Sequence, residues 1–531
     1  MVHCARPTLF RHMLVFTTFV LLVSPLLVAA TNPKVIRDTR HDTSPPLRDI
    51  ANLVRGSGGA DREANFPRST GSARVSLQPD AVAQELTSPL TGVTTVLNFE
   101  GQSADDNRSV FGFSFVPPDT NGAIGATQFL QMVNVTLAVY DKRTGARVLG
   151  PAAISSVWAG FGGPCETQDG GDPVVVYDQL ANRWLVSQFQ FNSTFTDNKQ
   201  CVAVSTTSDA TGPYNRYQYD FGADFPDYPK FGVWPDGYYY SANVFSPNGF
   251  SAAACAFDRA AMLVGAGAQM ICFRNPNAAS LLPSDLDGST LPPAGSPNYF
   301  LDIQDASGIN LYQLHADFAN PGNSTLSTPV RIAVAPFSDI CQFSFRLACI
   351  QQPEPGEKVD AIADRLMFRL AYRNFGDHES LVVNHTIEGG AMAGVRWYEI
   401  RSPQAGPFVF QQGTVVDPEI SFWMGSIAMD KRGNIALGFS ASEKRTNPSV
   451  FAVGRRPSDP SGFMSGPLVL AAGTGVQKSS FKRWGDYSSM DVDPSDDCTF
   501  WYTQEYQTEV GAFDWKTRIT AFKFDSCKKG K

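Results

Sequence analysis

The sequence predicts an all-β protein, a single β-propeller of seven blades with four antiparallel strands each. Three observations predict it. Charged residues are only 18% of the 531 residues, while glycine, proline and aromatic residues are plentiful, which is typical of turn-rich β proteins. From residue 92 to Cys527, short apolar–polar runs are separated by turn residues about every ten positions. A strand–turn–strand unit also recurs along this region.

The recurring unit has an aspartate in the turn between its two strands. Aspartate at the first turn position accepts hydrogen bonds from the backbone N–H groups after it, and Gly, Asn or Pro supplies the bend. The unit is found at residues 137–149, 174–189, 231–245, 426–442 and 488–506, with Asp141, Asp178, Asp236, Asp430 and Asp493 in the turns.

The units are spaced as a propeller requires, since repeated four-stranded units around a centre leave few free edges. Residues 297–415 match poorly, so six or eight blades and a pair of β-sandwiches remain alternatives. Residues 94–101 are expected to add a strand to the closing blade, which the last cysteine pair fastens. One short helix is expected within residues 257–267. The units start near residues 117, 172, 228, 297, 363, 422 and 484.

The N-terminal part of the chain differs from the rest. Residues 1–30 have the pattern of a secretory signal peptide, and Pro25 within the apolar run disfavours the alternative of a membrane anchor. Residues 31–91 lack periodicity and are predicted to be a flexible low-complexity leader. The propeller domain is expected over residues 92–527. The mature protein is therefore expected to be secreted and extracellular, with no membrane span.

The cysteines and sequons agree with secretion. Eight cysteines remain once Cys4 leaves with the signal peptide, and an even count in a secreted chain indicates disulfides whose connectivity the sequence alone leaves open. Without a CxxC motif, a structural zinc site is disfavoured. Pairing of near neighbours gives Cys165–Cys201, Cys255–Cys272, Cys341–Cys349 and Cys498–Cys527. Sequons predict surface glycosylation, in a eukaryotic host, at Asn107, Asn134, Asn192, Asn323 and Asn384.

The net charge limits the class of partner. It is −8 at pH 7 for the whole chain, and about −10 after loss of the two arginines of the signal peptide. This acidity argues against nucleic acid or an anionic membrane as partner. A polysaccharide or cell-surface glycan is the expected partner, and the protein is expected to be a monomer.

Five long motifs lie at residues 117–134, 227–243, 255–267, 281–300 and 483–506. They resemble a family of secreted β-propeller-like proteins of bacteria and some eukaryotes, and the resemblance covers residues 92–527. It implies a secreted propeller and carries over no activity. Sialidase-type propellers are a more distant comparison, because their repeated turn motif is present only as a degenerate form at 495–501 and their arginine-bearing motif is not evident.

Candidate site residues lie just before the expected innermost strands, which converge on a central channel in a propeller. Blade five is expected to add Arg373, or alternatively Arg369. The expected catalytic residues are Asp172, Asp486, Tyr487, Lys230 and Arg373, and the expected binding residues are Asp119, Asp227 and His378.

The candidate site residues are compatible with three kinds of chemistry, and the sequence does not distinguish between them. Two carboxylates perform glycoside hydrolysis. Tyr487 with His378 or Lys230 is suited to a lyase acting on an acidic sugar, with Arg373 neutralising the sugar carboxylate. The carboxylates are also suited to a central calcium ion, the one cofactor considered. The structural alternative is that Asp172 and Asp486, each after a glycine, cap turns.

An EF-hand is rejected for residues 491–502. Its first, third, fifth and seventh positions fit, but Asp496 stands where glycine is needed and Tyr502 where a bidentate glutamate is needed. A looser calcium site remains an alternative there. Asp285 and Asp287 are read as a polar turn, with calcium ligation as the alternative.

The remaining polar and aromatic candidates are interpreted as structural. Two histidines beside apolar residues are expected to be packing groups, and four aromatic residues on strands are expected to fill the space between blades. The histidines are His315 and His385, and the aromatic residues are Trp184, Trp234, Trp501 and Tyr502.

The function expected from these observations is that of a secreted glycoprotein enzyme, a glycoside hydrolase or polysaccharide lyase acting at the channel mouth. The alternative is a non-catalytic extracellular module that binds glycans or proteins. Recurrence of Asp, Lys, Arg and Tyr before the innermost strands favours the enzyme. Serine-hydrolase elbows, P-loops and HExxH pairs are absent from the sequence, which removes those enzyme classes.

Overall fold

The protein is all-β, as predicted. The structure, a computed structural model, describes Met1 and residues 32–53, 60–63, 74–86, 88–341, 348–480 and 482–527. Apart from Met1, the expected signal peptide therefore lies outside the described residues. Within the described ranges, no helix has the length and apolar content that crossing a bilayer requires.

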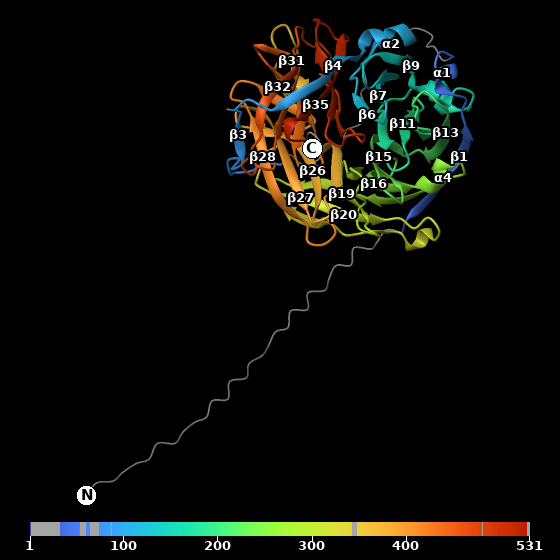
Figure 1. Cartoon of the computed structure of the whole chain (residues 1–531). Coiled ribbons are helices and arrows are strands. Elements are labelled where there is room, and N and C mark those ends of the chain that lie inside the picture. The colour runs from blue at the N-terminus through green and yellow to red at the C-terminus, as the bar shows by residue number, and fades with distance from the viewer. Residues whose placement is uncertain are drawn as a thin grey trace.

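Four-stranded antiparallel runs follow one another around the molecule, and the colours of Figure 1 run around it in chain order. The first run is β6 (Asn121–Ile124), β7 (Gln128–Val133), β8 (Thr136–Asp141) and β9 (Arg147–Ala153). The second is β10 (Val174–Asp178), β11 (Arg183–Phe191), β12 (Asn198–Ser205) and β13 (Tyr214–Gly222). The third is β14 (Phe225–Val233), β15 (Tyr238–Ser246), β16 (Gly249–Phe257) and β17 (Gln269–Asn275).

The second half of the chain continues the same pattern. Next come β18 (Leu282–Asp287), β19 (Asn298–Asp305) and β20 (Gly308–His315), which pairs with β21 (Thr325–Leu326) and β22 (Val330–Ala333). They are followed by β25 (Met367–Asn374), β26 (Glu379–Gly389), β27 (Met392–Arg401) and β28 (Phe408–Val416). The last two sets are β29 (Ser421–Met429), β30 (Ile435–Glu443), β31 (Thr446–Arg455) and β32 (Ser465–Ala471), then β33 (Ser489–Val492), β34 (Phe500–Gln507) and β35 (Trp515–Phe524).

The first strands of these sheets form a closed ring. Contacts run in chain order from β6 through β10, β14, β18, β25 and β29 to β33, and β33 contacts β6 again. The poorly matching middle of the sequence is the place where the ring is least regular, because β18 and β25 pair directly as parallel strands and join two sheets into one. The segments that lead into the first strands therefore meet at one mouth of the ring.

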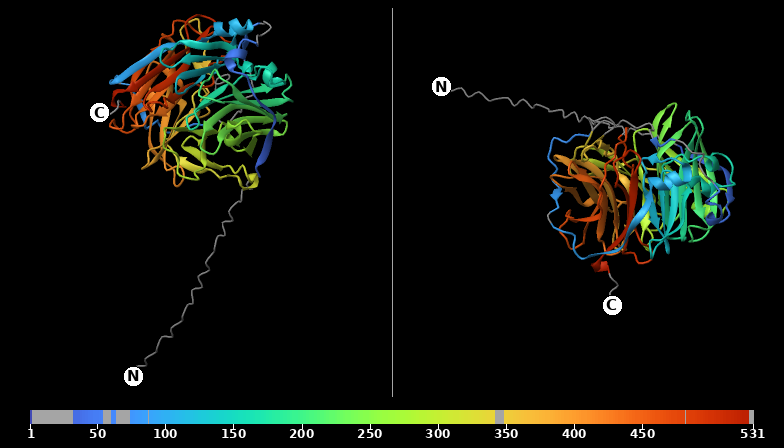
Figure 2. Two further views of the ribbon diagram at one scale, coloured as in Figure 1. Left: turned by 45° about the vertical axis from the view of Figure 1, so that its right-hand side comes forward. Right: turned by 90° about the horizontal axis from the view of Figure 1, so that it is seen from above.

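An N-terminal strand completes the last sheet. β4 (Val93–Ser103) pairs with β35 in an antiparallel register that sets Leu97 opposite Ala521. Figures 1 and 2 show blue β4 lying along red β35. The strand expected at residues 94–101 is thus confirmed. Because β4 comes from the other end of the chain, this pairing closes the ring.

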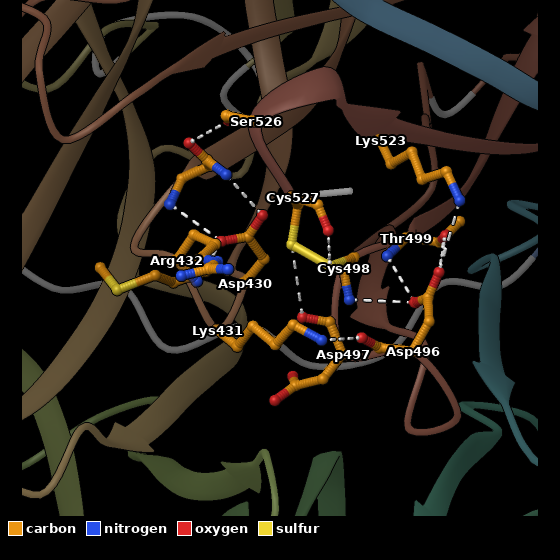
Figure 3. Close-up of a disulfide and its surroundings, with 12 residues drawn as sticks. Asp430, Lys431, Arg432, Asp496, Asp497, Cys498, Thr499, Lys523, Ser526 and Cys527 are labelled. Carbon is orange, nitrogen blue, oxygen red and sulfur yellow. Dashed lines mark hydrogen bonds and ion pairs between the residues drawn. A yellow bond between two sulfur atoms is a disulfide. The ribbon is translucent and has the colours of Figure 1, made fainter. Parts of the chain in front are cut away.

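The Cys498–Cys527 disulfide fastens the same sheet, as expected, by joining the β33–β34 turn to the end of β35. Figure 3 shows its surroundings. Lys431, in the turn of the neighbouring sheet, donates from Nζ to the carbonyl oxygen of Asp496 at 2.7 Å, and its backbone N–H donates to Asp497 O at 3.1 Å. The disulfide therefore lies where two sheets are also hydrogen-bonded. All four expected disulfides are present.

The described part of the expected flexible leader is ordered, which corrects the prediction for residues 31–91. β1 (Lys34–Thr43) lies between β13 and β17 and pairs antiparallel with both, and β3 (Ala83–Glu85) pairs in parallel with β28. In Figure 1, blue β1 and β3 lie on opposite sides of the ring. These segments bury little of their own apolar surface. Their order comes from the backbone groups of the edge strands that they cover.

Short elements fill the connections. α1 (Leu47–Ile50) follows β1, β2 (Arg62–Glu63) pairs with β5 (Phe115–Val116), and β23 (Ala348–Ile350) pairs with β24 (Val359–Asp360). α2 (Ala104–Phe111) follows β4, and α3 (Pro164–Thr167) contains Cys165. The helix expected within residues 257–267 is confirmed as α4 (Arg259–Leu263), where the Asp258 side chain accepts a hydrogen bond from Ala261 N at 3.0 Å.

Most side chains interpreted as structural occupy the interior as expected. The four aromatic residues are buried, and Trp501 of β34 stacks on Phe129 of β7 across two sheets at 5.5 Å. His385 is buried against Phe337. His315 is exposed instead, because it ends β20 at the rim, so the packing prediction is wrong there. Four of the five turn aspartates cap as predicted: Asp178, for example, accepts hydrogen bonds from Leu180 N and Ala181 N. Asp236 differs, because its carboxylate accepts from the Tyr239 hydroxyl instead.

Three of the five sequons do not lie at the surface, which corrects the expectation for them. Asn107, Asn134 and Asn384 are buried. The Asn107 amide donates to Asn134 O at 2.6 Å, and the Asn134 amide donates to Asp119. A glycan on a buried amide has no room in the folded protein. Asn192 and Asn323 are at least partly exposed.

Candidate functional site at the ring mouth

Six of the eight predicted site residues come together at the ring mouth, the end of the ring where the first strands begin. They lie on four segments of the chain: one before β6, one before β10, one within β14 and one before β33. The residues are Asp119, Asp172, Asp227, Lys230, Asp486 and Tyr487.

The backbone of these segments is unusual. Asp119 and Asp172 have φ of 45° and Tyr228 has φ of 55°, in the left-handed region that residues with a Cβ rarely adopt. Aspartate tolerates this conformation better than most residues, but tyrosine does not. Strained residues of this kind persist only where the surroundings hold them, and they gather at functional sites.

Asn134 holds two of the segments in place. Its Nδ2 donates to Asp119 Oδ2 at 2.6 Å, and its Oδ1 accepts a hydrogen bond from Asp172 N at 2.9 Å. Asp119 Oδ1 in turn accepts from Asp486 N at 2.6 Å. From the sequence, Asn134 was predicted only to be a glycosylation site. No local signal distinguishes a sequon asparagine from one that connects segments far apart in sequence.

Lys230 lies between two aromatic rings. Its Nζ is 3.5 Å from the ring centroid of Tyr228 and 3.9 Å from that of Tyr487, and it donates to Pro229 O at 2.8 Å. The side chain is fully buried. The Tyr487 hydroxyl donates to Pro173 O at 3.0 Å, which fixes this ring below the amine. Cation–π contacts favour the charged amine, whereas burial opposes it.

Two arginines that were not predicted from the sequence supply positive charge beside the carboxylates of the ring mouth. Arg483 forms an ion pair with Asp486 and another with Asp360 at 3.2 Å. Arg365 pairs with Asp364 at 2.9 Å and lies 4.5 Å from the ring centroid of Tyr228. Arg483 is three residues before Asp486, and that spacing in the motif RWGD was the available signal.

Burial and like charges shift the pKa values of the carboxyls. Burial, with the Asp486 carboxylate next, raises the pKa of Asp172 to about 6. Burial and neighbouring carboxylates also raise the pKa values of Asp119 and Asp227 well above their ordinary range. Burial raises the pKa of Glu505, which accepts a hydrogen bond from Gly485 N, to about 8.

Burial acts on Lys230 in the opposite direction. It lowers the pKa of the amine to about 7, although the carboxylates of Asp172 and Asp486 favour the charged form. A carboxyl with a pKa near 6 and an amine with a pKa near 7 therefore share one site. A carboxyl and an amine whose pKa values lie close to neutral pH meet one requirement of general acid–base chemistry.

Access to this cluster differs between its members. Asp119, Asp172, Lys230 and Tyr487 are buried, while Asp227 and Asp486 are partly exposed. The side chain of Asp486 is 16% exposed. Asp227 and Asp486 are thus the acidic side chains of the cluster that are most exposed to solvent.

Arg373 and His378 do not belong to this cluster, which corrects their prediction. Both lie toward the other end of β25, whose eight residues span about 26 Å at about 3.3 Å per residue. Arg373 pairs with Asp497 at 2.6 Å. His378, in the next turn, contacts Asp377 at 2.7 Å. The arginine that this sheet supplies to the ring mouth is Arg365, two residues before β25.

The carboxylates considered for calcium are paired with basic side chains. Asp285 and Asp287 are on β18 and bind Arg369, so they form neither a polar turn nor a calcium site. In the 491–502 segment, Asp493 binds Lys142 at 2.6 Å. The described part of the chain contains no group of three or more His, Cys, Asp or Glu side chains arranged to hold a metal ion.

Comparisons with known proteins give low similarity throughout. Neither protein-family models nor curated proteins match this chain, so the family resemblance inferred from its motifs stays a prediction. The chain is similar to the N-terminal domain of Nup159, with a TM-score of 0.36, 9% identity and coverage of 83% of this chain and 99% of that one.

Two solved carbohydrate-active enzymes are similar at the same level. For the polysaccharide lyase Uly1 the TM-score is 0.35 and the identity 7%, covering 93% of this chain and 99% of that one. For an exo-β-1,3-galactanase from Clostridium thermocellum the TM-score is 0.30 and the identity 8%, and the match covers 78% of this chain and 87% of that one. Overlap this low assigns neither a fold nor an activity.

Proposed function

We propose that the chain is a seven-bladed β-propeller and a secreted enzyme that acts on extracellular polysaccharide, as a hydrolase or a lyase, at the ring mouth. The ring of first strands and its closure by β4 support the propeller. The four disulfides indicate an oxidising compartment, which supports secretion. The monomeric state expected from the sequence is part of the same proposal.

The observation that carries the enzyme proposal is the convergence of acid–base groups from different sheets. A non-catalytic module is expected to have few buried charges and aromatic platforms at its rim. Here Asp172 and Lys230 titrate near neutrality beside the partly exposed Asp486. Ionisable groups with such shifts mark candidate catalytic positions.

The residues take distinct roles in this proposal. Asp172, ionised above its pKa of about 6, acts as the base, and Lys230, charged below its pKa of about 7, acts as the acid. Asp486 and Asp227 bind the sugar hydroxyls. Tyr487 holds Lys230, because its hydroxyl already donates to Pro173 O and burial raises its pKa.

The test is a panel of neutral and acidic polysaccharides incubated with the mature protein, with and without EDTA. New reducing ends report a hydrolase, and additional absorbance of unsaturated sugars reports a lyase. Asp172→Asn and Asp486→Asn are expected to lose product, while Asp377→Asn, whose side chain is 84% exposed at the far end of β25, keeps it. Full product from both ring-mouth variants would overturn the site, and glycan binding without product would favour the non-catalytic module.

A further inference from the structure

A cleft lies on the side of the ring away from the mouth, between the sheet of β25–β28 and the sheet of β29–β32. Its volume is about 270 Å³. Phe375, at the end of β25, and Arg432, in the β29–β30 turn, line it. Because β25 runs from the ring mouth to this cleft, the two sites are separated by the length of that strand. The cleft is therefore distinct from the site described above.

Three guanidinium groups line this cleft on a chain whose net charge is negative. They belong to Arg401, Arg432 and Arg455. The nearby carboxylate of Glu399 is already bound, because it accepts hydrogen bonds from Arg401 Nε at 2.7 Å and from the side-chain amide of Gln411 at 2.5 Å. Glu399 therefore pairs with Arg401. A second carboxylate, that of Asp459, also lines the cleft, but neither Arg432 nor Arg455 forms an ion pair among the described residues.

Arg455 is buried without an ion pair among the described residues. Its Nη2 donates to Asp459 O at 2.9 Å and its Nε to Phe463 O at 3.2 Å, and both acceptors are neutral carbonyls. Burial lowers the pKa of this guanidinium, and the nearby carboxylates of Glu399 and Asp459 offset that effect only in part. Arg432 is exposed, and no side-chain hydrogen bond of it is found in the described ranges. An anion bound in the cleft would give both guanidinium groups an ion-pair partner.

Aromatic surface adjoins these charges. Phe410 is 46% exposed, and the Arg401 guanidinium lies 3.4 Å from its ring centroid. Across the cleft, the rings of Phe375 and His378 stack at 4.8 Å. A cleft lined by an exposed aromatic ring and by the guanidinium groups of Arg432 and Arg455 offers both an apolar contact and charge-assisted hydrogen bonds. That combination suits a ligand with an apolar ring face and an anionic substituent.

We propose that this cleft is a second binding site for an acidic sugar unit. Arg432 and Arg455 bind its carboxylate or sulfate group, and Phe410 packs against the apolar face of the sugar ring. The choice of a sugar rests on the proposed function, whereas the preference for an anion rests on the arginines alone. Such a site would hold an acidic polymer on the protein while the ring mouth acts on another part of the chain.

The test measures binding, so it does not depend on turnover. The full mature protein is titrated by calorimetry with a uronic-acid oligosaccharide, with the same oligosaccharide after reduction of its carboxyl groups, and with inorganic sulfate. Arg432→Ala and Phe410→Ala are compared with Arg143→Ala, a matched loss of an exposed arginine in the β8–β9 turn. Asp172→Asn reports on the ring mouth independently.

The acidic oligosaccharide is expected to bind at least about tenfold more tightly than its reduced form, and Arg432→Ala to weaken binding about tenfold. Phe410→Ala is also expected to weaken it, while Arg143→Ala leaves it unchanged. Equal binding of the acidic and reduced forms, or equal effects of Arg432→Ala and Arg143→Ala, would overturn the proposal. Sulfate binding as tightly as the oligosaccharide would overturn the sugar as ligand. If the protein turns over no polysaccharide but still binds the acidic oligosaccharide in the cleft, only the proposed enzymatic function would be wrong.

Discussion

The guanidinium of Arg369 donates to the carboxylate of Asp287 at 2.6 Å, and its Nε donates to Asp285 at 2.6 Å. A third carboxylate, that of Asp491, lies 3.4 Å away. The four residues come from three first strands, β25, β18 and β33, and are largely shielded from solvent. One cation therefore compensates three carboxylates on different strands of the ring.

Arg369→Met is expected to destabilise the protein by about 3–5 kcal/mol at pH 7, because it leaves buried carboxylates without a counter-ion. Urea unfolding measures this loss. It should shrink at pH 5, where the uncompensated carboxyls are protonated, since burial already raises the pKa of Asp491 to about 7 with Arg369 present. Arg331→Met, which breaks an exposed pair with Asp305, is the control. Equal losses in the two variants would contradict this role of Arg369.

Asp172→Asn is expected to abolish activity and to stabilise the fold above pH 6. Burial raises the pKa of Asp172 from 3.8 to about 6, so the folded state binds more protons than the unfolded state in that interval. The stability that Asp172 contributes is therefore full below about pH 4 and is lost as pH rises through 6. Asparagine removes this loss, which amounts to about 3 kcal/mol at most. Thermal unfolding from pH 4 to pH 8 checks it, and a pH-independent difference would count against the shift.

Activity is expected to be bell-shaped in pH, with limbs near 6 and 7. The acidic limb reflects ionisation of Asp172 and the basic limb reflects loss of the proton from Lys230, and both values belong to the coupled cluster. Lys230→Met should lower kcat/KM by about 10²–10⁴-fold and remove the basic limb. The measurement is kcat/KM from pH 4.5 to pH 9. A basic limb that persists in Lys230→Met would assign it to another group.

Loss of the closing disulfide should cost more than loss of the shortest one. The Cys498–Cys527 bond closes a loop with a sequence separation of 29, against 8 for Cys341–Cys349. Loop-closure entropy then gives about 3.6 and about 2.5 kcal/mol. Paired serine variants, compared by thermal unfolding without reductant, test the order. A larger loss for the shorter loop would show that entropy of the unfolded chain does not govern these bonds.

Glycans are expected at Asn192 and Asn323 only, when the protein is secreted from a eukaryotic host. The amides of Asn107, Asn134 and Asn384 are buried, whereas Asn323 is exposed and Asn192 partly so. Glycopeptide mapping of the native secreted protein distinguishes the five sites. A glycan on Asn134 in active protein would be incompatible with its hydrogen bond to Asp119.

The parts of the fold that follow from local chemistry were predictable. Aspartate turns, such as those at Asp178 and Asp430, depend on hydrogen bonds within four residues. The pairing of near cysteines, the strand at residues 94–101 and the short helix after β16 were also correct. The positions of Asp119, Asp172 and Asp486 followed from a single rule, that such residues precede the first strands. Asp227 and Lys230 reach the same mouth from within β14, where the rule did not place them.

The failures involve contacts that no local pattern encodes. β1 is polar and looks disordered by composition, yet it is ordered because β13 and β17 present edges to it. Arg365 lies two residues before β25, and Arg373 lies near the end of that strand. Only the direction of the strand decides which of the two arginines reaches the mouth. Asn134 is buried because it binds Asp119 and Asp172, and neither contact is visible in its sequon.

The pairing of β4 with β35 also means that the ring can close only after nearly the whole chain has been synthesised. Arg518 and Asn98, which meet across these strands, are separated by 420 positions. At about 5–20 residues per second, synthesis of the intervening chain takes on the order of 20–80 s. During that interval β4 lacks the strand with which it pairs in the described structure, and the unfinished ring presents open strand edges. A chain interrupted before β35 therefore lacks the pairing that closes the ring.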